Sequence, residues 1–476
     1  MRLADLADKR VAVWGYGREG RAALSTLRKY FLDKPLSLIC SSAEAENAQA
    51  LDDPTLSIIN GDADVATLAQ FDVVIKSPGV SAYKSPVPEA IAAGVRFTSG
   101  SALWFAEHPQ ARTICVTGTK GKSTVVALIA HLLRKNGLCI ALAGNIGLPL
   151  LELLDPPREP NWWVIELSSF QTRDFDGAPT VAVITNLYEE HLDWHGTREK
   201  YAADKLAIAA RAQHLVVNVQ PELLAATVGH PARSMFNATD GWHVHDDAIW
   251  RGEERILPLA SVPLPGLHNA HNVCAALAAI EAASEECGHG WSLLDFSDQG
   301  RAHKIDACAM AMHVASFRAL PHRLQTLGQR DGSHYINDSI STTPYATVEA
   351  LRSLAGRAVT VLVGGFDRGV DWSIFVDYVS KYPPHAIVTM GENGAAIANA
   401  LRRTAAQGFV LEYAESLDAA VACARALTPA NGAILLSPGA PSFDQFHDYA
   451  ERGREFARFA GFDPAAIAQI EGLGIA

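Results

Sequence analysis

The stretch from Thr113 to Lys135 constrains the fold of this chain more than any other. A β-branched run from Thr113 to Thr117 predicts a buried strand, and apolar residues at helical spacing follow between Val125 and Leu133. A glycine-rich turn that ends in Lys122 and Ser123 separates the two. A strand, a glycine turn, Lys-Ser and a helix in this order are typical of a phosphate-binding α/β domain.

Each part of this turn has a physical role toward a phosphate. The glycines let backbone N–H groups approach an anion, the helix N-terminus adds positive potential, Lys122 adds a full charge and Ser123 can hold Mg²⁺. Val116 stands where the general phosphate loop has its first glycine, so this is the shorter G-x-x-G-K-S form. The alternative is an ordinary strand–helix turn with a chance Gly-Lys-Ser. The candidate phosphate contacts are Gly118, Thr119, Lys120, Gly121, Lys122, Ser123 and Thr124.

The composition is that of a large globular protein. The chain has 476 residues, which predicts about three domains, and is 49% hydrophobic and 19% charged. A net charge of −12 argues against nucleic acid as the main partner. The seven cysteines form no C-x-x-C pair, and we find neither a signal peptide nor an apolar run of about 18 residues. We therefore expect a cytoplasmic protein without a membrane span.

A second glycine-rich turn lies near the start of the chain. Gly15, Gly17 and Gly20 match a dinucleotide fingerprint. A nicotinamide site also needs an acid at the end of the second strand, but after the strand-like run Leu36 to Cys40 the first acid is Glu44. We therefore favour a Rossmann-like domain that holds the diphosphate of another nucleotide. NAD binding and a purely structural role are the alternatives.

Polar residues follow several predicted strands of the central region. Lys122, Asn145, Glu166 and His191 come after strand-like runs, and parallel sheets place their sites at the carboxyl ends of strands. These four side chains should therefore point at one crevice. Glu166 is either a Mg²⁺ ligand or an acid turned to solvent, and His191 is either a metal ligand or a surface-loop histidine.

Four other residues have a plain interpretation beside a functional one. By local sequence alone, Lys205 reads as a solvated lysine and His195 as a surface histidine. Asp338 follows a strand, where it either orients a base or a metal-bound water or caps the next turn. Arg323 pairs either with a phosphate or with surface acids.

The last third of the chain predicts another doubly wound α/β domain, with alternating strands and helices. Strands are predicted at 334–337, 359–363, 386–390 and 433–436, and helices at 344–354, 394–405, 417–427 and 444–460. Ser99 to Ser101 is predicted to be a hinge. The fold class is therefore α/β with three domains. They are a Rossmann-like domain (1–101), a central P-loop-type domain (102–318) and a doubly wound Rossmann-like domain (319–476). Residues 285–318 receive no function.

Together these motifs resemble the Mur ligases of peptidoglycan synthesis over nearly the whole chain, and within them the glutamate-adding enzymes. The matching stretches are TGTKGKST (117–124), GNIGLP (144–149), ELSSFQ (166–171), EEHLDWHG (189–196), YAADKL (201–206), GLHNAHN (266–272), LPHR (320–323), NDS (337–339), GGFDRG (364–369) and SPGAPSFDQF (437–446).

The resemblance implies an enzyme that uses ATP and two Mg²⁺ ions. The implied metal ligands are Ser123, Glu166, His191 and a carbamylated Lys205, and the implied catalytic residues are Lys122, His191, Lys205 and Asp338. Besides the phosphate loop, the implied ATP contacts are Asn269, Asn272, Arg323 and Asp338. UDP-N-acetylmuramoyl-L-alanine would bind through Gly15, Arg18, Glu19, Ser77, Pro78, Gly79 and Asn145.

The implied reaction joins glutamate to the precursor. The alanine carboxylate attacks the γ-phosphate of ATP, and the glutamate amine then displaces phosphate from the acyl phosphate. Closure of the third domain would complete the site and exclude water. The glutamate contacts would be Thr342, Arg368, Ser442 and Tyr449.

The glutamate pocket departs from the family pattern. The usual N-D-S-K-A-T-N reads NDSISTT from position 337, so Ile340 removes a positive charge. Arg368 replaces a lysine, and the two are not interchangeable; Tyr449 replaces a phenylalanine. This form resembles the variant subfamily that adds L-glutamate, whose product a separate epimerase converts. Ligation of D-glutamate is the alternative.

Two rival hypotheses have different consequences. A folylpolyglutamate-synthase-like ligase shares the ATPase core, but the first domain and ELSSFQ speak against it. A nucleotide-binding regulatory protein would have lost some of Lys122, Glu166, His191 and Lys205, yet all four are present. We expect a monomer whose partners are its small-molecule substrates.

Overall fold

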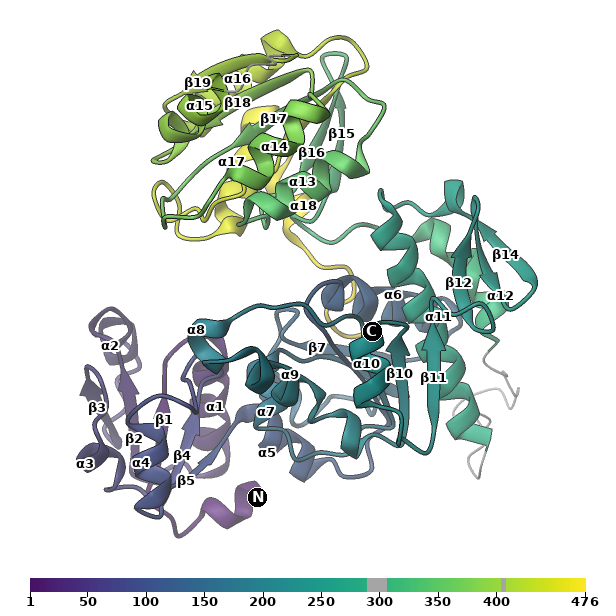
Figure 1. Ribbon diagram of the computed structural model, residues 1–476. Helices are drawn as coiled ribbons and strands as arrows, with labels where there is room; N and C mark the ends of the chain where they lie inside the picture. The colour runs from purple at the N-terminus through teal and green to yellow at the C-terminus, as the bar shows by residue number, and fades with distance from the viewer. Residues whose placement is uncertain (289–305, 404–407) are drawn as a thin grey trace. The chain divides into compact units, whose positions relative to one another are not determined.

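The computed structural model describes residues 1–288, 306–403 and 408–476. The prediction of an α/β protein is confirmed, since the strands form three sheets and helices connect them (Figure 1). The chain divides into two compact units. One contains residues 1–261, 271–315 and 472–476, and the other contains residues 262–270 and 316–471. Among the described residues, no helix is long and apolar enough to cross a membrane.

The N-terminal sheet is parallel, with the strand order β3-β2-β1-β4-β5. The chain order reverses between β1 and β4, which makes the crevice beyond these two strands the expected ligand site of such a sheet. The strands are β1 (Val11–Trp14), β2 (Leu36–Cys40), β3 (Leu56–Asn60), β4 (Val73–Lys76) and β5 (Arg96–Thr98), and the helices are α1 (Arg18–Tyr30), α2 (Ser42–Gln49), α3 (Val65–Leu68) and α4 (Val87–Ala92).

The central sheet has the order β14-β13-β12-β11-β10-β9-β6-β8-β7-β21. Its middle strands β6 to β11 run parallel, whereas β12, β13 and β14 form an antiparallel extension. The strands are β6 (Thr113–Thr117), β7 (Ile140–Gly144), β8 (Trp162–Glu166), β9 (Val181–Ile184), β10 (His214–Asn218), β11 (Arg233–Phe236), β12 (Trp242–His245), β13 (Ala248–Arg251), β14 (Glu254–Pro258) and β21 (Gly474–Ile475).

The last strand of the chain belongs to this central sheet. β21 pairs antiparallel with β7, so residues 472–476 return from the C-terminal region. The helices of the region are α5 (Gly100–Glu107), α6 (Lys122–Lys135), α7 (Ser169–Arg173), α8 (Leu192–His195), α9 (Arg198–Leu206), α10 (Pro221–Ala226), α11 (Leu267–Gly288) and α12 (Ala307–Ala311). The boundaries predicted for the three domains stay a prediction, and residues 289–305 of the unassigned stretch lie outside the described residues.

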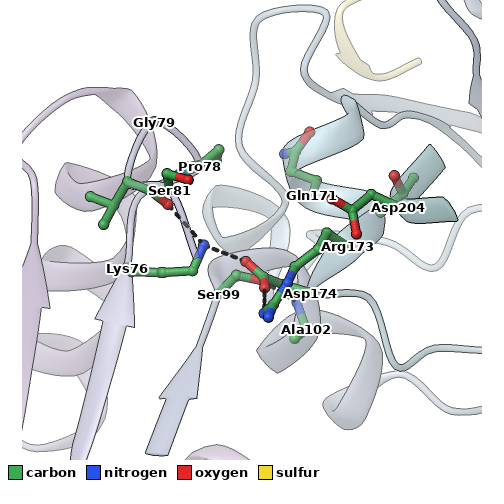
Figure 2. A network of polar contacts seen from close by, with 12 residues as sticks. Lys76, Pro78, Gly79, Ser81, Ser99, Ala102, Gln171, Arg173, Asp174 and Asp204 are labelled. Atoms are coloured by element: carbon green, nitrogen blue, oxygen red, sulfur yellow. Dashed lines mark hydrogen bonds and ion pairs between the residues drawn. The ribbon is translucent and has the colours of Figure 1, made fainter. Parts of the chain in front are cut away.

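The predicted hinge at Ser99 to Ser101 is wrong. Ser99 is the N-cap of α5, where its Oγ accepts a hydrogen bond of 3.2 Å from the Ala102 N–H (Figure 2). Gly100 and Ser101 form the buried first turn of that helix. A serine before a run of good helix formers satisfies the free N–H groups of a helix, and this signal outweighs the small size of the three residues.

The N-terminal and central sheets share one hydrophobic core. Leu24 and Leu27 of α1 lie in the same buried cluster as Trp104 of α5 and Trp163 of β8. The Trp104 and Trp163 rings meet edge to face, with 4.5 Å between their centroids. Continuous apolar packing of this kind fixes the geometry between the two sheets.

The C-terminal sheet has the order β15-β16-β20-β17-β18-β19, with only β15 antiparallel. Its strands are β15 (Gln325–Arg330), β16 (Ser333–Asn337), β17 (Val359–Val363), β18 (Ala386–Met390), β19 (Val410–Ala414) and β20 (Ala433–Leu436). Its helices are α13 (Pro344–Ser353), α14 (Ser373–Lys381), α15 (Gly394–Arg402), α16 (Leu417–Leu427), α17 (Tyr449–Ala460) and α18 (Pro464–Ala468).

The helix predicted at 444–460 is too long at its start. The Asp448 side chain accepts from the Glu451 N–H, so α17 begins at Tyr449. Residues 444–448 instead form part of the loop after β20. Of the helix predicted at 394–405, residues 404 and 405 lie outside the described part of the chain.

Candidate active site

The glycine turn after β6 is held against the end of β9. An ideal Cβ on Gly118 would lie 1.9 Å from Thr185 Oγ1, so only glycine fits there, and Gly118 has a φ of +143°. The Lys120 N–H donates to Asn186 Oδ1 (2.8 Å), and Thr185 Oγ1 donates to the Lys120 carbonyl (2.6 Å). Gly121, with a φ of +87°, precedes the first residue of α6. The turn is therefore pre-shaped, as anion-binding loops are.

The side chains of this turn are anchored on both sides. The Thr119 hydroxyl lies 2.7 Å from Tyr201 Oη, and Lys120 Nζ lies 2.6 Å from Glu190 Oε1. Ser123 is buried and Thr124 half-buried in the first turn of α6. Helix α9, through Tyr201, and the segment before α8, through Glu190, therefore help to hold the loop.

Two lysines converge on one carbonyl oxygen of the turn. Lys122 Nζ donates to the Gly118 carbonyl at 3.0 Å, and Lys205 Nζ donates to the same oxygen at 2.9 Å. Lys205 is buried on α9, so the interpretation of it as a solvated lysine is wrong. Burial lowers the pKa of Lys205 well below its ordinary value, and the charge of Lys122 lowers it further. The amine is therefore biased toward its neutral form.

Glu166 lies at the end of β8 with one oxygen paired and the other not. Asn145 Nδ2 donates to Glu166 Oε1 at 2.9 Å, while no described group hydrogen-bonds Oε2, which is buried. The residue is 1% exposed, so an acid turned to solvent is excluded. A buried carboxylate oxygen needs a partner, and a hard cation such as Mg²⁺ would supply one.

His191, in the loop after β9, has a half-exposed side chain. It has a φ of +56° at the N-cap of α8, and its ring lies 5.1 Å from the Phe170 ring. Burial lowers the pKa of His191, Glu190 opposes this shift, and Lys122 and Lys205 add to it. A neutral imidazole is the form that binds a metal. Of the four residues predicted to meet in one crevice, Asn145 hydrogen-bonds Glu166, and the charge of Lys122 acts on His191. Lys205, which is not among the four, lies close enough to Lys122 and Glu166 for their charges to act on it.

The donor set fits a magnesium site only with contributions from Ser123 and Lys205. Among the described residues, no group of three or more His, Cys, Asp and Glu side chains is placed to hold a metal ion. The set predicted from the sequence contains just two of these types, Glu166 and His191. The remaining donors would be a hydroxyl and a modified amine, together with water and phosphate oxygens, which Mg²⁺ accepts readily.

His195 is not a surface residue. It is fully buried, with Nδ1 2.7 Å from Asp204 Oδ2 and Nε2 3.0 Å from Ser169 Oγ. Its partners come from α7 and α9, so no sequence-local signal reveals them. Burial lowers the pKa of His195, and Asp204 opposes the shift.

Asn272 of α11 lies against the phosphate loop. An ideal Cβ on Gly121 would lie 2.4 Å from Asn272 Oδ1, so the amide occupies the space beside that glycine. Asn269, one turn earlier on the same helix, donates from Nδ2 to the Pro265 carbonyl at 2.7 Å. The structure thus brings Asn272 to the phosphate loop.

The glycine turn of the N-terminal sheet is as tightly built. An ideal Cβ on Gly20 would lie 1.8 Å from the Gly15 carbonyl oxygen, whereas one on Gly17 would meet nothing within 4 Å. The Tyr16 N–H donates to Glu44 Oε1 (3.0 Å), so this late acid serves the turn itself. Open space at Gly17 is what the approach of a ligand requires.

The other residues predicted to hold the UDP precursor surround this turn. Arg18 Nη1 donates to the Gly147 carbonyl at 3.3 Å, next to the Asn145 turn. Glu19 is half-buried, and burial raises its pKa to about 7. Ser77 Oγ donates to the Gly15 carbonyl (3.4 Å), and the carbonyls of Pro78 and Gly79 accept from Trp194 Nε1.

In the C-terminal unit, the described hydrogen bonds of the Asp338 carboxylate all come from residues of that same unit. Oδ1 accepts from the Leu324 N–H (3.0 Å), and Oδ2 accepts from the hydroxyls of Ser341 (2.5 Å) and Ser437 (2.8 Å). Burial raises the pKa of Asp338 to about 6, although these bonds oppose the shift. Arg323 lies half-buried in the preceding turn. These contacts favour the turn-capping interpretation of Asp338, and the catalytic role stays a prediction.

The predicted glutamate residues gather on the loops after β16, β17 and β20. Arg368 Nη2 donates to the Thr342 carbonyl at 2.7 Å. Ser442 is buried, and Tyr449 is partly exposed at the start of α17. Arg452 was not predicted: its buried guanidinium donates to Ser339 and to the Pro441 carbonyl and so joins two of these loops. Burial lowers its pKa to about 10.

Comparisons with known proteins agree with these motifs. A family model of the Mur ligase middle domain matches residues 116–280. The chain is 49% identical to the UDP-N-acetylmuramoyl-L-alanine–L-glutamate ligase of Xylella fastidiosa and 47% identical to that of Xanthomonas campestris, in each case over 100% of both chains. A Micromonospora enzyme of the same name is 37% identical over 96% of this chain and 97% of its own.

Solved structures share the fold at low identity. The UDP-N-acetylmuramate–alanine ligase of Thermotoga maritima has a TM-score of 0.56 at 16% identity, covering 94% of this chain and 98% of its own. A folylpolyglutamate synthase of Mycobacterium tuberculosis, complexed with ADP, has a TM-score of 0.53 at 16% identity, covering 72% and 91%. The full-length relatives confirm the resemblance seen in the motifs: this chain belongs to the Mur ligase family of enzymes.

Proposed function

We propose that this enzyme uses ATP to join L-glutamate to the alanine carboxylate of UDP-N-acetylmuramoyl-L-alanine in peptidoglycan synthesis. The observation that carries the proposal is that Lys122 and Lys205 both donate to Gly118 of the phosphate loop, with the half-paired Glu166 close enough to Lys205 to act on its charge. The names of the full-length relatives give the same reaction. ADP in the folylpolyglutamate synthase that shares the fold supports the use of ATP.

The reaction brings two anions together, so the site must neutralise charge. An alanine carboxylate oxygen attacks the γ-phosphorus, the bond to ADP breaks, and an acyl phosphate forms. Lys122 and the loop N–H groups offset the charge that develops on the phosphoryl oxygens. The glutamate amine then attacks the acyl carbon and loses its proton, and phosphate leaves with the former carboxylate oxygen.

Two magnesium ions would complete this arrangement. Ser123 and Glu166 would hold one ion, and His191 and a carbamate on Lys205 would hold the other. Bound magnesium supplies Lewis-acid neutralisation of the phosphate charge. The low pKa of Lys205 favours the neutral amine that carbamate formation needs.

Selection of L-glutamate rests on the loop that carries Thr342. Ile340 and Arg368 differ from the family pattern, and Arg368 already contacts the Thr342 backbone. A planar guanidinium holds a carboxylate in two parallel bonds, which changes how the amino acid is oriented. Ligation of D-glutamate is the competing hypothesis.

The test is amide formation with each enantiomer. The enzyme, ATP, Mg²⁺ and UDP-N-acetylmuramoyl-L-alanine are incubated with L- or D-glutamate, and product is measured by mass spectrometry. We expect product with the L-enantiomer at a kcat/KM at least about 100-fold above that with D-glutamate. Product with D-glutamate alone contradicts the stereochemical part. No product with either one contradicts the ligase function.

A further inference from the structure

A buried ion pair joins the N-terminal sheet to the central region. The Lys76 side chain, at the end of β4, is 1% exposed, and its Nζ lies 2.5 Å from Asp174 Oδ2 (Figure 2). The Lys76 Nζ also donates to the Val80 carbonyl at 3.3 Å, and Arg173 Nη1 lies 2.7 Å from Asp174 Oδ1. Burying such a pair gives little net stability, but breaking it is costly. Its effect is to fix geometry.

The turn that follows Lys76 is bonded to the segment that follows His191. Trp194 Nε1 donates to the carbonyls of Pro78 (3.1 Å) and Gly79 (3.2 Å). In return, Ser81 Oγ donates to the Trp194 carbonyl at 2.6 Å. The turn proposed to touch the UDP precursor is therefore hydrogen-bonded, in both directions, to the loop proposed to hold a metal ion.

A second chain of hydrogen bonds runs to the residue before Lys205. Tyr83 Oη donates to Asp204 Oδ1 at 2.6 Å, and Asp204 Oδ2 lies 2.7 Å from His195 Nδ1. Since Asp204 is a neighbour of Lys205 on α9, the position of the lysine is tied to Tyr83. The edge-to-face Tyr83 and Trp194 rings, 5.9 Å apart, close this network.

We propose that Tyr83, Trp194 and Asp204 are positioning residues for the ligation reaction. They hold the Ser77–Gly79 turn and the segment from His191 to Lys205 as one rigid piece. A precursor seated on that turn then presents its carboxylate at a fixed distance from Lys205. This inference rests on the proposed function. It adds the hydrogen-bond network that aligns the proposed precursor site with the proposed phosphate and metal site.

Two properties separate positioning from simple stabilisation. Removal of the Tyr83 hydroxyl leaves every residue proposed to touch UDP in place, so affinity for the precursor should hold. Misalignment of reacting groups by about 1 Å costs up to ~100-fold in rate. Positioning therefore predicts a loss in kcat with KM unchanged, whereas a loosened turn would lose affinity and thermal stability together.

The chain offers a matched control in Tyr30. Tyr30 Oη of α1 donates to Asp155 at 2.7 Å, so it also joins the N-terminal region to a central-region carboxylate. This bond lies at neither the Ser77–Gly79 turn nor the His191–Lys205 segment. Tyr30→Phe removes the same chemical group from a bond of the same kind.

The experiment compares Tyr83→Phe, Trp194→Phe and Tyr30→Phe in the full-length enzyme. Amide formation gives kcat and KM for the precursor, calorimetry gives the Kd of UDP, and thermal unfolding gives Tm. We expect kcat to fall about tenfold or more in Tyr83→Phe and Trp194→Phe. KM and Kd should stay within twofold of wild type in Tyr83→Phe, whereas Trp194→Phe also removes the donor to the Pro78 and Gly79 carbonyls. Tyr30→Phe should keep kcat within twofold.

Each other result contradicts a defined statement. If both test variants keep kcat within twofold, or if KM, Kd and Tm worsen in step with kcat in Tyr83→Phe, the positioning role is wrong while the ligase function stands. If wild-type enzyme forms no amide, the proposed function fails and the inference fails with it.

Discussion

Two amines on one backbone oxygen define the chemistry of this site at the residue scale. Lys122 and Lys205 both donate to the Gly118 carbonyl, at 3.0 and 2.9 Å. Two ammonium groups this close would repel one another, and a buried site weakens solvent screening of that repulsion, so the charged form of Lys205 is disfavoured beside Lys122. An anion between them relieves the repulsion, so the pair favours phosphate or a carbamate on Lys205.

Replacement of Lys122 removes the charge proposed to face the transferred phosphate. We expect Lys122→Ala to lower kcat by at least about 100-fold, the usual cost of losing one transition-state donor. Circular dichroism and Tm should stay close to wild type, since the half-buried Lys122 side chain donates to the Gly118 and Thr119 carbonyls of the turn. Near-normal phosphate release from a folded variant would refute the phosphate-loop assignment.

Lys205→Ala tests the carbamate. The variant removes the side chain that would carry the anionic oxygens, so we expect turnover to fall by about 100-fold or more. Formate or acetate at high concentration should restore part of it by standing in for the carbamate. A variant that still binds magnesium yet shows no such rescue would count against carbamylation.

Glu19 makes stability depend on pH. Its pKa is raised from 4.5 to about 7 by burial, so the folded protein binds this proton more tightly than the unfolded chain does. Stability from this group is therefore present below about pH 4.5 and is lost as pH rises through 7. Solvent screening of the half-buried group limits the effect to on the order of 1 kcal/mol.

Glu19→Gln removes this titration and keeps an acceptor for Gln171 Nε2. We expect the variant to unfold at a higher temperature than wild type at pH 8, with the difference vanishing toward pH 4.5. Thermal unfolding across this range measures it. An equal difference at all pH values would show that Glu19 does not titrate as described.

At the element scale, the candidate ligand sites lie at the two glycine turns, where the missing side chains let other groups approach the backbone closely. Gly20 of α1 packs on the Gly15 carbonyl, whereas Gly17 faces open space with a φ of −68°. The third glycine position, Gly20, serves helix–strand packing, and the second, Gly17, leaves room for a ligand. This division matches the distinct roles of glycines in dinucleotide-type turns.

Alanine at these two positions should have opposite consequences. Gly20→Ala places a Cβ 1.8 Å from the Gly15 oxygen, so we expect a loss of 1–3 kcal/mol or more in unfolding free energy. Gly17→Ala should be nearly neutral for stability and weaken UDP binding. Denaturant unfolding and calorimetry with UDP measure the two effects, and equal destabilisation by both variants would contradict this account of the turn.

The sequence predicts those strands that are buried runs of β-branched residues. Strands without such a run are not recognised from the sequence. β6 and β17 have the bounds expected from their runs of Val, Ile and Thr. β3 and β19 were missed because they lie at sheet edges, where outward-facing residues dilute the apolar pattern. β10 was missed because its short Leu-Val-Val run does not distinguish strand from helix.

Prediction of the candidate site from the sequence is limited in the same way: it fails where long-range contacts decide a residue's surroundings. Lys122, Glu166 and His191 follow strands, so topology alone predicts that they meet. His195 was misplaced on the surface because its partners Ser169 and Asp204 come from other elements. Local sequence carries no record of such long-range pairing.

At the scale of the whole molecule, the described units divide the reaction between them. The unit with the first two sheets carries the candidate precursor turn and the phosphate loop, joined through the Lys76–Asp174 pair and the Trp194 bonds. The other unit carries the candidate glutamate residues on three loops of its own sheet. Under the proposed function, one unit would activate the carboxylate and the other would select the amino acid.

The most direct test of the account follows an oxygen atom. The precursor is prepared with ¹⁸O in its alanine carboxylate, and the phosphate released during ligation of L-glutamate is analysed by mass spectrometry. Attack of the carboxylate on ATP predicts one ¹⁸O atom in each phosphate released, together with one amide formed. Unlabelled phosphate, or phosphate release without amide, would contradict activation of the carboxylate as an acyl phosphate.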